Sequence, residues 1–355
     1  MGLECPTIDE GEIYCIREVD FLTQKQGPYV KLGKTTRKTA QRLKEHQTGN
    51  PRQETAEFVH YTDMMSSLEK FLHYRFAPNC VNSEWFIMDT PTVMSDVAPL
   101  IQKLAAEHKK VRPTFDEWKK QASTVSNGNT IPANPTHNKL HSHYLKLWGR
   151  YKKAEGVFEI CKLDLQLLIG TNNGIENMVY LVTSEKIPFD KEGFLASLAS
   201  DAERNKCYKE EKKVLPKAPK IDGELSLSKI DSGLNDVLKK MKKTYDSAKP
   251  TPANLSNSIA PVTTAMKTAH QAYLESKREV KEAEWELQKI TAELVSHLGD
   301  NESIDGIITW ERVEKVSQKF ERDIAEKQFP TQYSKFEGTP ETIIRRVNID
   351  DGKKY

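Results

Sequence analysis

The alternation of apolar and polar positions predicts a small α/β unit in the first 110 residues. A two-residue period, typical of half-buried strands, recurs between polar loops. The strands are predicted at residues 12–17, 29–32, 56–61 and 85–88. Segments with the 3.6-residue period of a helix lie between these strands and after the last one. The helices are predicted from Thr36 or Thr39 to about residue 48, from Asp63 to Pro78, and around residues 92–110.

The remainder of the chain has a helical pattern and contains an internal repeat. Two segments align without gaps at an offset of 129 residues, given by 273 − 144 for Tyr273 and Tyr144. Each copy begins with a long helix whose apolar residues alternate spacings of four and three. This heptad stripe predicts helices that pair with each other or with another chain.

These patterns predict the fold class α+β. We expect a small α/β domain with an antiparallel three-stranded sheet flanked by helices, followed by a mainly helical, internally duplicated coiled-coil or hairpin region. The predicted division is a first domain at 1–112, a linker at 113–138, repeat copy one at 139–212, a linker with a short amphipathic helix at 213–268, and repeat copy two at 269–355.

Composition narrows the classes of protein. The net charge of +2 over 355 residues gives no global signal for a polyanion, so any nucleic-acid surface must come from local clusters. Five cysteines without a CxxC pair argue against a disulfide framework and a zinc site. We find no apolar run of membrane-spanning length and no signal-peptide pattern, and we therefore expect a cytoplasmic protein without a membrane partner.

The candidate chemistry lies in the first domain. Six residues there supply a phenol, cations, a proton acceptor, an amide and a carboxylate: Tyr14, Lys31, Arg42, His46, Glu69 and Asn82. Arg42 and His46 are four apart and share a helix face, and Glu69 lies at the edge of an apolar stripe. Taken singly, each also has an ordinary interpretation, such as a packed strand tyrosine, a solvated helix face, a surface ion pair or a turn asparagine.

Taken in order, the motifs resemble the GIY-YIG endonuclease superfamily over about the first 90 residues. The resemblance rests on GEIY at 11–14, KLG at 31–33, the Arg-x3-His pair, the helical glutamate and the later asparagine. The segments LEKFLHYRF and EWF resemble the phage and bacterial branch, in which KIGKT replaces YIG. The fold this implies is a GIY-YIG-type nuclease domain.

The resemblance also implies roles. Tyr14 would help to deprotonate the attacking water, and His46 would accept a proton from Tyr14. Arg42 would neutralise the scissile phosphate, Glu69 would bind one Mg²⁺ or Mn²⁺, and Asn82 would orient the site. Lys31 stands where most members carry a second tyrosine, which departs from the parent pattern.

The chemistry is coherent without the resemblance. Phosphodiester hydrolysis develops negative charge that a metal and an arginine stabilise, while a base aligns the water. A basic stretch beside these residues is predicted to contact DNA phosphates: Lys34, Arg37, Lys38, Lys44 and Arg52.

A second resemblance covers the C-terminal tail. Gly299-Asp300, GIITWERV at 306–313 and the FP-x2-Y motif at 329–333 resemble the tail of lambda-exonuclease-like phage recombination nucleases. It implies a shared helical accessory module and no second active site.

We therefore predict a metal-dependent DNA endonuclease, encoded by a phage or by a bacterial mobile or defence system. Its partners would be DNA and further copies of itself, joined through the C-terminal helices. A catalytically weak DNA- or protein-binding module is the alternative that Lys31 keeps open. A structural virion or scaffold protein that uses the helical arm is a third possibility.

Overall fold

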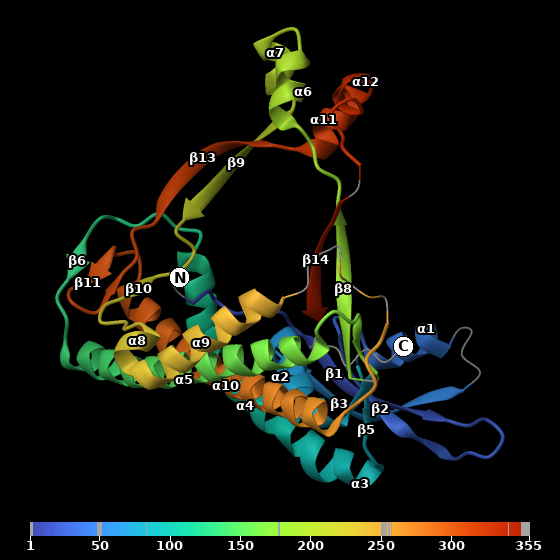
Figure 1. Ribbon diagram of the computed structural model, residues 1–355. Coiled ribbons are helices and arrows are strands. Elements are labelled where there is room, and N and C mark those ends of the chain that lie inside the picture. Colours follow the sequence, from blue (N-terminus) through green and yellow to red (C-terminus); the bar gives the residue numbers. More distant parts are fainter. Residues whose placement is uncertain are drawn as a thin grey trace.

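Figure 1 shows an N-terminal sheet domain that lies beside a base of long helices. Two β-ribbons rise from this base and end in a helical cap. The computed structural model describes residues 3–47, 52–82, 84–176, 178–249, 254, 256, 258–339 and 341–348. Within these ranges, the side chains of residues 46, 47, 82, 180–186 and 341–348 lie outside the description.

The N-terminal domain is built on one antiparallel sheet with strand order β3-β1-β2-β5-β4. Its strands are β1 (Gly11–Val19), β2 (Gln26–Thr35), β3 (Gln53–Thr62), β4 (Cys80–Asn82) and β5 (Trp85–Ile87). Its helices are α1 (Thr39–Gln47), α2 (Met65–Arg75), the turn η1 (Ala77–Asn79), α3 (Thr90–Thr92), η2 (Val93–Val97) and α4 (Ala98–Gln121). The α+β class is confirmed, and the short strands β5 and β4 extend the expected three-stranded sheet to five.

The alternation along β1 separates two faces of this sheet. Ile13 and Cys15 point to the core with Val30 and Leu32 of β2, against α2, η2 and α4. Arg17 is also buried on this side, where Glu57 and the carbonyl oxygens of residues 27 and 88 accept its hydrogen bonds. The opposite face carries the other residues of β1, including Tyr14.

Helix α4 continues well beyond the predicted end near residue 110. It runs through Pro113 to Gln121, so the first part of the predicted 113–138 linker is helical. An internal proline costs about 3 kcal/mol. Phe115 and Trp118 follow it and are fully buried in the core beside α10. Their burial outweighs the local preference, and the domain boundary itself stays a prediction.

The segments that align in sequence fold alike. Helices α5 (Pro135–Ile169) and α10 (Thr264–Leu298) each span 35 residues and begin and end 129 residues apart. Each is followed by a glycine at φ 57°, Gly170 or Gly299, in the left-handed region that glycine adopts readily. The short strands β7 (Gly174–Ile175) and β11 (Ser303–Ile304) follow at the same offset.

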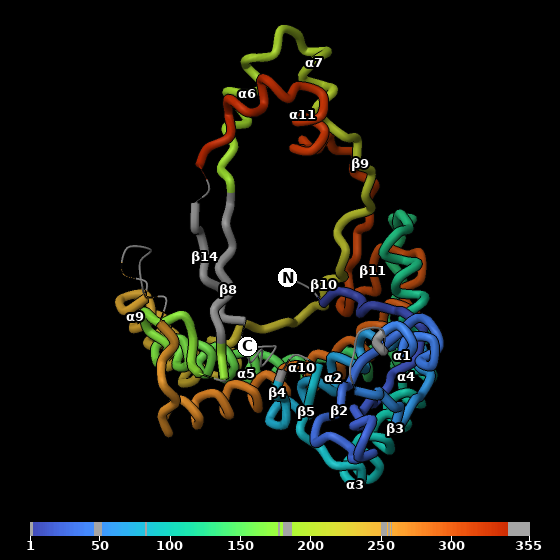
Figure 2. The backbone as a smooth tube through the Cα atoms, turned by 90° about the vertical axis from the view of Figure 1, so that its right-hand side faces the viewer, coloured from blue at the N-terminus to red at the C-terminus, as the bar shows by residue number. Residues whose placement is uncertain are grey.

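The heptad stripes of α5 and α10 pair with each other inside the chain. Residues near the start of α5, such as Tyr144, share a core with Leu287 and Leu294 near the end of α10. Residues near the end of α5, such as Leu165, share another with Tyr273. The two helices are therefore antiparallel and form the base seen edge-on in Figure 2. Helices α8 (Leu227–Ile230) and α9 (Ser232–Ala248) pack on α5.

Two ribbons rise from this base, and each combines one strand from either copy. Strand β8 (Val179–Lys186) pairs with β14 (Glu341–Asn348), and β9 (Tyr208–Leu215) pairs with β13 (Val313–Phe320). Both reach a cap of α6 (Lys191–Ser197), α7 (Asp201–Asn205), α11 (Arg322–Gln328) and α12 (Pro330–Tyr333) (Figure 1). The cap has its own core around Phe194.

A small sheet lies at the foot of the β9–β13 ribbon. Its order is β10-β12-β11-β6, and its strands are β6 (Thr130–Ile131), β10 (Lys220–Ile221), β11 and β12 (Ile308–Thr309). Over the part of the chain that the structure describes, no helix is both long and apolar enough to cross a bilayer.

Candidate active site

Tyr14 lies directly opposite Gly33 across the β1–β2 ladder. A Cβ atom on Gly33 would lie 2.6 Å from the phenol oxygen and 2.7 Å from the ring, so the tyrosine ring lies against glycine backbone. The Tyr14 side chain is almost fully buried. The glycine of the KLG motif thus fits the tyrosine of the GEIY motif.

Helix α1 brings Arg42 to this tyrosine. The helix is anchored on β1 because the Glu12 carboxylate accepts the backbone N–H of Thr39 at 2.7 Å, at the helix N-terminus. The Arg42 guanidinium lies within electrostatic reach of the Tyr14 phenol and 3.2 Å from the Glu45 carboxylate. Helix α1 thus places a cation near the phenol.

Helix α2 contributes Glu69 at the open edge of β2. Strand β5 pairs with β2 only as far as Lys31, so Lys34 lies beyond it. Lys34 Nζ lies 3.0 Å from Glu69 Oε2 and donates to Ser66 Oγ at 2.7 Å. The His73 ring contacts the carbonyl oxygen of residue 32 at 2.9 Å and fixes the same helix to the strand. Glu69 is therefore a well-placed and mostly buried carboxylate that already carries one cationic partner.

Lys31 has an ion-pair partner that the sequence did not reveal. Its ammonium lies 3.3 Å from the Glu84 carboxylate. Glu84 precedes Trp85, the residue that pairs with Lys31 in the β2–β5 ladder. The register between these strands brings the two charges together.

The surroundings keep Tyr14 protonated at neutral pH. Burial raises the pKa of its phenol above the ordinary value of 10, and the Glu84 carboxylate raises it further. The positive charge of Arg42 opposes this increase in pKa, and Glu69 adds a smaller increase. Tyr14 is thus within electrostatic reach of both carboxylates and of Arg42, while remaining a neutral hydrogen-bonding group.

Two of the six predicted residues lie outside the side-chain description. His46 is on α1, four residues after Arg42, and Asn82 ends β4 opposite Trp85. Their backbones flank the site. Their predicted roles stay predictions.

The predicted DNA-contacting stretch is largely paired with carboxylates. Arg37 binds Glu45 at 2.5 and 2.9 Å. Arg52 lies 3.3 Å from Glu18. Lys34 is paired with Glu69, and Lys44 is exposed on α1. Lys38 contacts Glu12 at 3.4 Å but remains 86% exposed, which leaves it the most available to a phosphate.

Sequence reasoning missed four residues whose contacts depend on the pairing of strands or on the ends of helices. They are Glu12, which anchors α1, Gly33 as the support of Tyr14, Ser66 beside Lys34, and Glu84 beside Lys31. The KLG motif contained Gly33, but its contact with Tyr14 required the pairing of β1 with β2.

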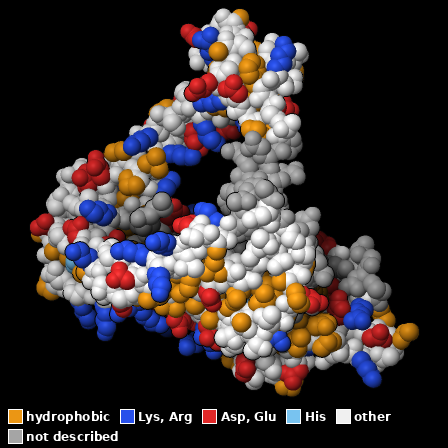
Figure 3. All heavy atoms as spheres, viewed as in Figure 1, with side chains coloured by type: hydrophobic (Ala, Val, Ile, Leu, Met, Phe, Trp, Pro, Cys, Tyr) orange, Lys and Arg blue, Asp and Glu red, His pale blue; other side chains and the backbone are white. Residues whose placement is uncertain are grey.

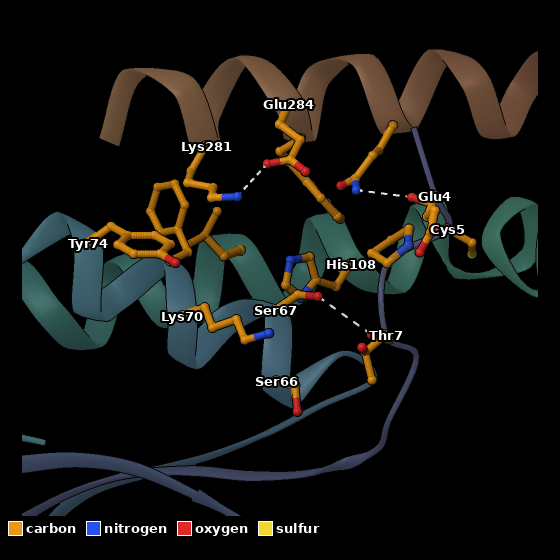
Figure 4. A pocket seen from close by; sticks show the side chains of 15 residues that line it. Glu4, Cys5, Thr7, Ser66, Ser67, Lys70, Tyr74, His108, Lys281 and Glu284 are labelled. Atoms are coloured by element: carbon orange, nitrogen blue, oxygen red, sulfur yellow. Dashed lines mark hydrogen bonds and ion pairs between the residues drawn. The ribbon is translucent and has the colours of Figure 1, made fainter. Parts of the chain in front are cut away.

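A separate cavity of about 310 Å³ lies between α2, α4, α10 and the N-terminal segment. Figure 4 shows Lys70, Tyr74 and His108 around it, with the Lys281–Glu284 ion pair on the α10 side. Of the α2 residues that line it, Ser66 also touches the Lys34–Glu69 cluster. The cavity otherwise lies apart from Tyr14 and Arg42.

The geometry agrees with the comparisons to known proteins. Residues 11–104 match the family model of the T5orf172 domain. This family is related to phage nuclease domains of the GIY-YIG and HNH types, so residues 11–104 are similar to nuclease-like or DNA-binding domains. No curated protein and no solved structure matches the chain.

Proposed function

We propose that the N-terminal domain is a GIY-YIG-type endonuclease that hydrolyses phosphodiester bonds in DNA. The observation that carries the proposal is that the Tyr14 phenol, packed against Gly33, lies within electrostatic reach of both Arg42 and the Glu69 carboxylate. A phosphate drawn to Arg42 would place its developing charge against a guanidinium. The nuclease-like family match covers all four residues.

Tyr14 has a defined part in this reaction. Because its pKa is raised, the phenol is neutral at pH 7 and serves as a hydrogen-bond partner for the attacking water. The proton must then pass to another acceptor. His46, four residues after Arg42, is the acceptor that we propose.

The residues present fit a hydrated divalent cation. Mg²⁺ commonly binds through one or two carboxylates, with water and substrate phosphate completing its shell. Glu69 supplies one carboxylate, and the described residues contain no cluster of three or more His, Cys, Asp or Glu ligands. Bound at Glu69, Mg²⁺ or Mn²⁺ would supply Lewis-acid stabilisation of the phosphate. Lys34 would then give up its ion pair with Glu69, while its hydrogen bond to Ser66 could remain.

Plasmid cleavage tests the proposal. We expect the wild-type chain to nick supercoiled plasmid with Mg²⁺ or Mn²⁺. Glu69→Gln should slow nicking by at least about 100-fold, and Tyr14→Phe by on the order of 100-fold, because each removes a group that acts at the phosphate or the water. The exposed cap substitution Glu192→Gln is the matched control and should leave the rate unchanged.

Either of two results would reject this site. Nicking that survives Glu69→Gln at the wild-type rate would show that the carboxylate has no catalytic part. Absence of nicking by the wild type, on every topology and with both metals, would favour the second candidate.

The second candidate function is a DNA-binding module without cleavage. Two ion pairs favour it, because Lys31 with Glu84 and Lys34 with Glu69 satisfy charges that a nuclease would present to metal and substrate. In either case we propose that the duplicated arm acts as a scaffold or docks a partner. Homo-oligomerisation stays a prediction, since the heptad stripes pair within the chain, and light scattering tests it directly.

A further inference from the structure

The β9–β13 ribbon carries two pairs of directly opposed lysines. The antiparallel register places Lys209 opposite Lys319 and Lys213 opposite Lys315. Because side chains alternate between faces, positions four apart share a face, so both pairs lie on the same side of the ribbon. Between them lies Glu211, opposite a serine.

This face has an excess of positive charge. Like charges directly opposite each other destabilise a strand pair. Glu211 contacts Lys213 at 2.6 Å, and Glu321, just after β13, contacts Lys319 at 2.9 Å. Four lysines thus face one carboxylate on the strands and one beyond them, and all four lysines are exposed.

The opposite face of the ribbon has a different character. Tyr208 and Phe320 pack there into the cap core, and Glu210, Lys212 and Glu314 give that face a slight negative charge. The strand residues of the two faces therefore carry net charges of opposite sign.

We propose that the lysine face of the β9–β13 ribbon binds the phosphate backbone of duplex DNA. Four residues of strand place the lysine pairs about 13 Å apart, a length of duplex axis that carries roughly eight phosphate charges. A two-stranded ribbon also fits the major groove. In the space-filling view, lysine and arginine side chains gather along this arm, which borders an opening (Figure 3). The choice of DNA as the polyanion rests on the proposed function, whereas the charge pattern does not.

The test measures affinity for a 30-base-pair duplex by fluorescence anisotropy over a series of salt concentrations. The full chain carries Glu69→Gln throughout, so that cleavage cannot interfere. Four substitutions, Lys209→Gln, Lys213→Gln, Lys315→Gln and Lys319→Gln, remove the lysine face. The matched control removes four exposed lysines from α9, with Lys239→Gln, Lys240→Gln, Lys242→Gln and Lys243→Gln.

We expect the ribbon variant to bind at least 10-fold more weakly at 100 mM salt. The slope of log affinity against log salt should fall in magnitude by about 2 to 4, since each lost phosphate contact contributes about 0.9. The α9 control, with the same net charge, should stay within about twofold of the parent. Equal losses in both variants, or no loss in the ribbon variant, would overturn the proposal.

Two further measurements distinguish DNA binding by the ribbon from a loss of folding and from the proposed nuclease activity. Thermal unfolding of the ribbon variant should not fall below that of the parent, because opposed like charges are removed. A wild-type chain that binds duplex through the ribbon but does not nick plasmid would reject the nuclease and keep the ribbon. A chain that nicks plasmid with unchanged rate and salt dependence after the four ribbon substitutions would keep the nuclease and reject the DNA-binding role of the ribbon.

Discussion

At the scale of single residues, the candidate site depends on a position without a side chain. Gly33 allows the Tyr14 ring to lie on the β2 backbone, within electrostatic reach of Arg42. Burial of the Tyr14 side chain, to which this contact contributes, is the main reason why its pKa is raised.

Gly33→Ala tests this contact. The added methyl group would overlap the Tyr14 ring, so we expect a loss of about 1–3 kcal/mol in the free energy of unfolding and slower plasmid nicking. Denaturant unfolding measures the first effect. The control is Gly149→Ala in α5, where a Cβ atom meets nothing within 4 Å and should stabilise the helix by about 0.5–1 kcal/mol. If Gly33→Ala left both stability and nicking unchanged, the contact with Tyr14 would have no importance.

Sequence reasoning placed Tyr14, Arg42 and Glu69 correctly on a strand and two helices because the local periods of these elements are strong. It could not find Glu84, since a glutamate in a turn carries no local signal. The partner of Lys31 became visible only with the register of β2 against β5. Likewise, the sequence offered an ion pair as the ordinary interpretation of Glu69 but did not show its partner, which the structure identifies as Lys34.

At the scale of elements, α4 joins the nuclease-like domain to the repeated arm. His108 of α4 contacts the Trp285 ring edge-on at 5.0 Å. Beside it, Glu107 accepts hydrogen bonds from Lys289 at 2.6 Å and from the indole N–H of Trp285 at 3.2 Å. This contact is a buried polar junction between α4 and α10.

The junction predicts a pH dependence of stability. Burial lowers the pKa of His108 from 6.5 to about 4, although Glu107 and Asp63 oppose the shift and Lys289 adds to it. Between pH 6.5 and 4 the unfolded chain binds a proton at this histidine and the folded chain does not, so stability is lost as the pH falls. The full shift corresponds to about 3 kcal/mol.

Urea unfolding at pH 7 and at pH 4.5 measures this loss. His108→Gln should reduce the difference between the two pH values by up to about 2 kcal/mol, because the glutamine does not titrate. His143→Gln, an exposed histidine on α5, is the control and should keep the wild-type difference. Identical pH dependence in all three proteins would mean that His108 is not buried as an uncharged group.

The ribbon strands show where pattern reasoning fails for whole elements. β9 reads YKEEKKVL and β13 reads VEKVSQKF, and both are mostly exposed. Neither has the apolar alternation that marks a half-buried strand, and the predicted linker at 213–268 began inside β9. Their pairing is specified by the cap and by the base at their ends, which lie far away in sequence.

At the scale of the whole molecule, the duplication explains the arm. The paired helices α5 and α10 form the base. Each copy contributes one strand that runs from the base to the cap and another that returns to the base. Because β8 pairs with β14 and β9 with β13, neither ribbon exists within a single copy. The two copies therefore form one unit inside the chain, as two subunits of a dimer would.

The cap closes this unit, and Phe194 lies at its centre. Its ring is fully buried and lies 5.4 Å from the ring of Phe189 and 5.8 Å from that of Tyr333. Phe194→Ala should cost the cap about 3–5 kcal/mol. Since an isolated two-stranded ribbon is marginal in water, we expect β9 and β13 to open together with the cap.

Limited trypsin digestion followed by mass spectrometry measures this opening. Cleavage at the ribbon lysines should become on the order of 100-fold faster, because proteolysis follows the population of the open form. The fragment with the N-terminal domain and the helical base should persist, and plasmid nicking should be unchanged. Leu22→Ala, at a position 94% exposed, is the control. Loss of the whole chain in one step would show instead that cap, base and nuclease-like domain unfold as one cooperative unit.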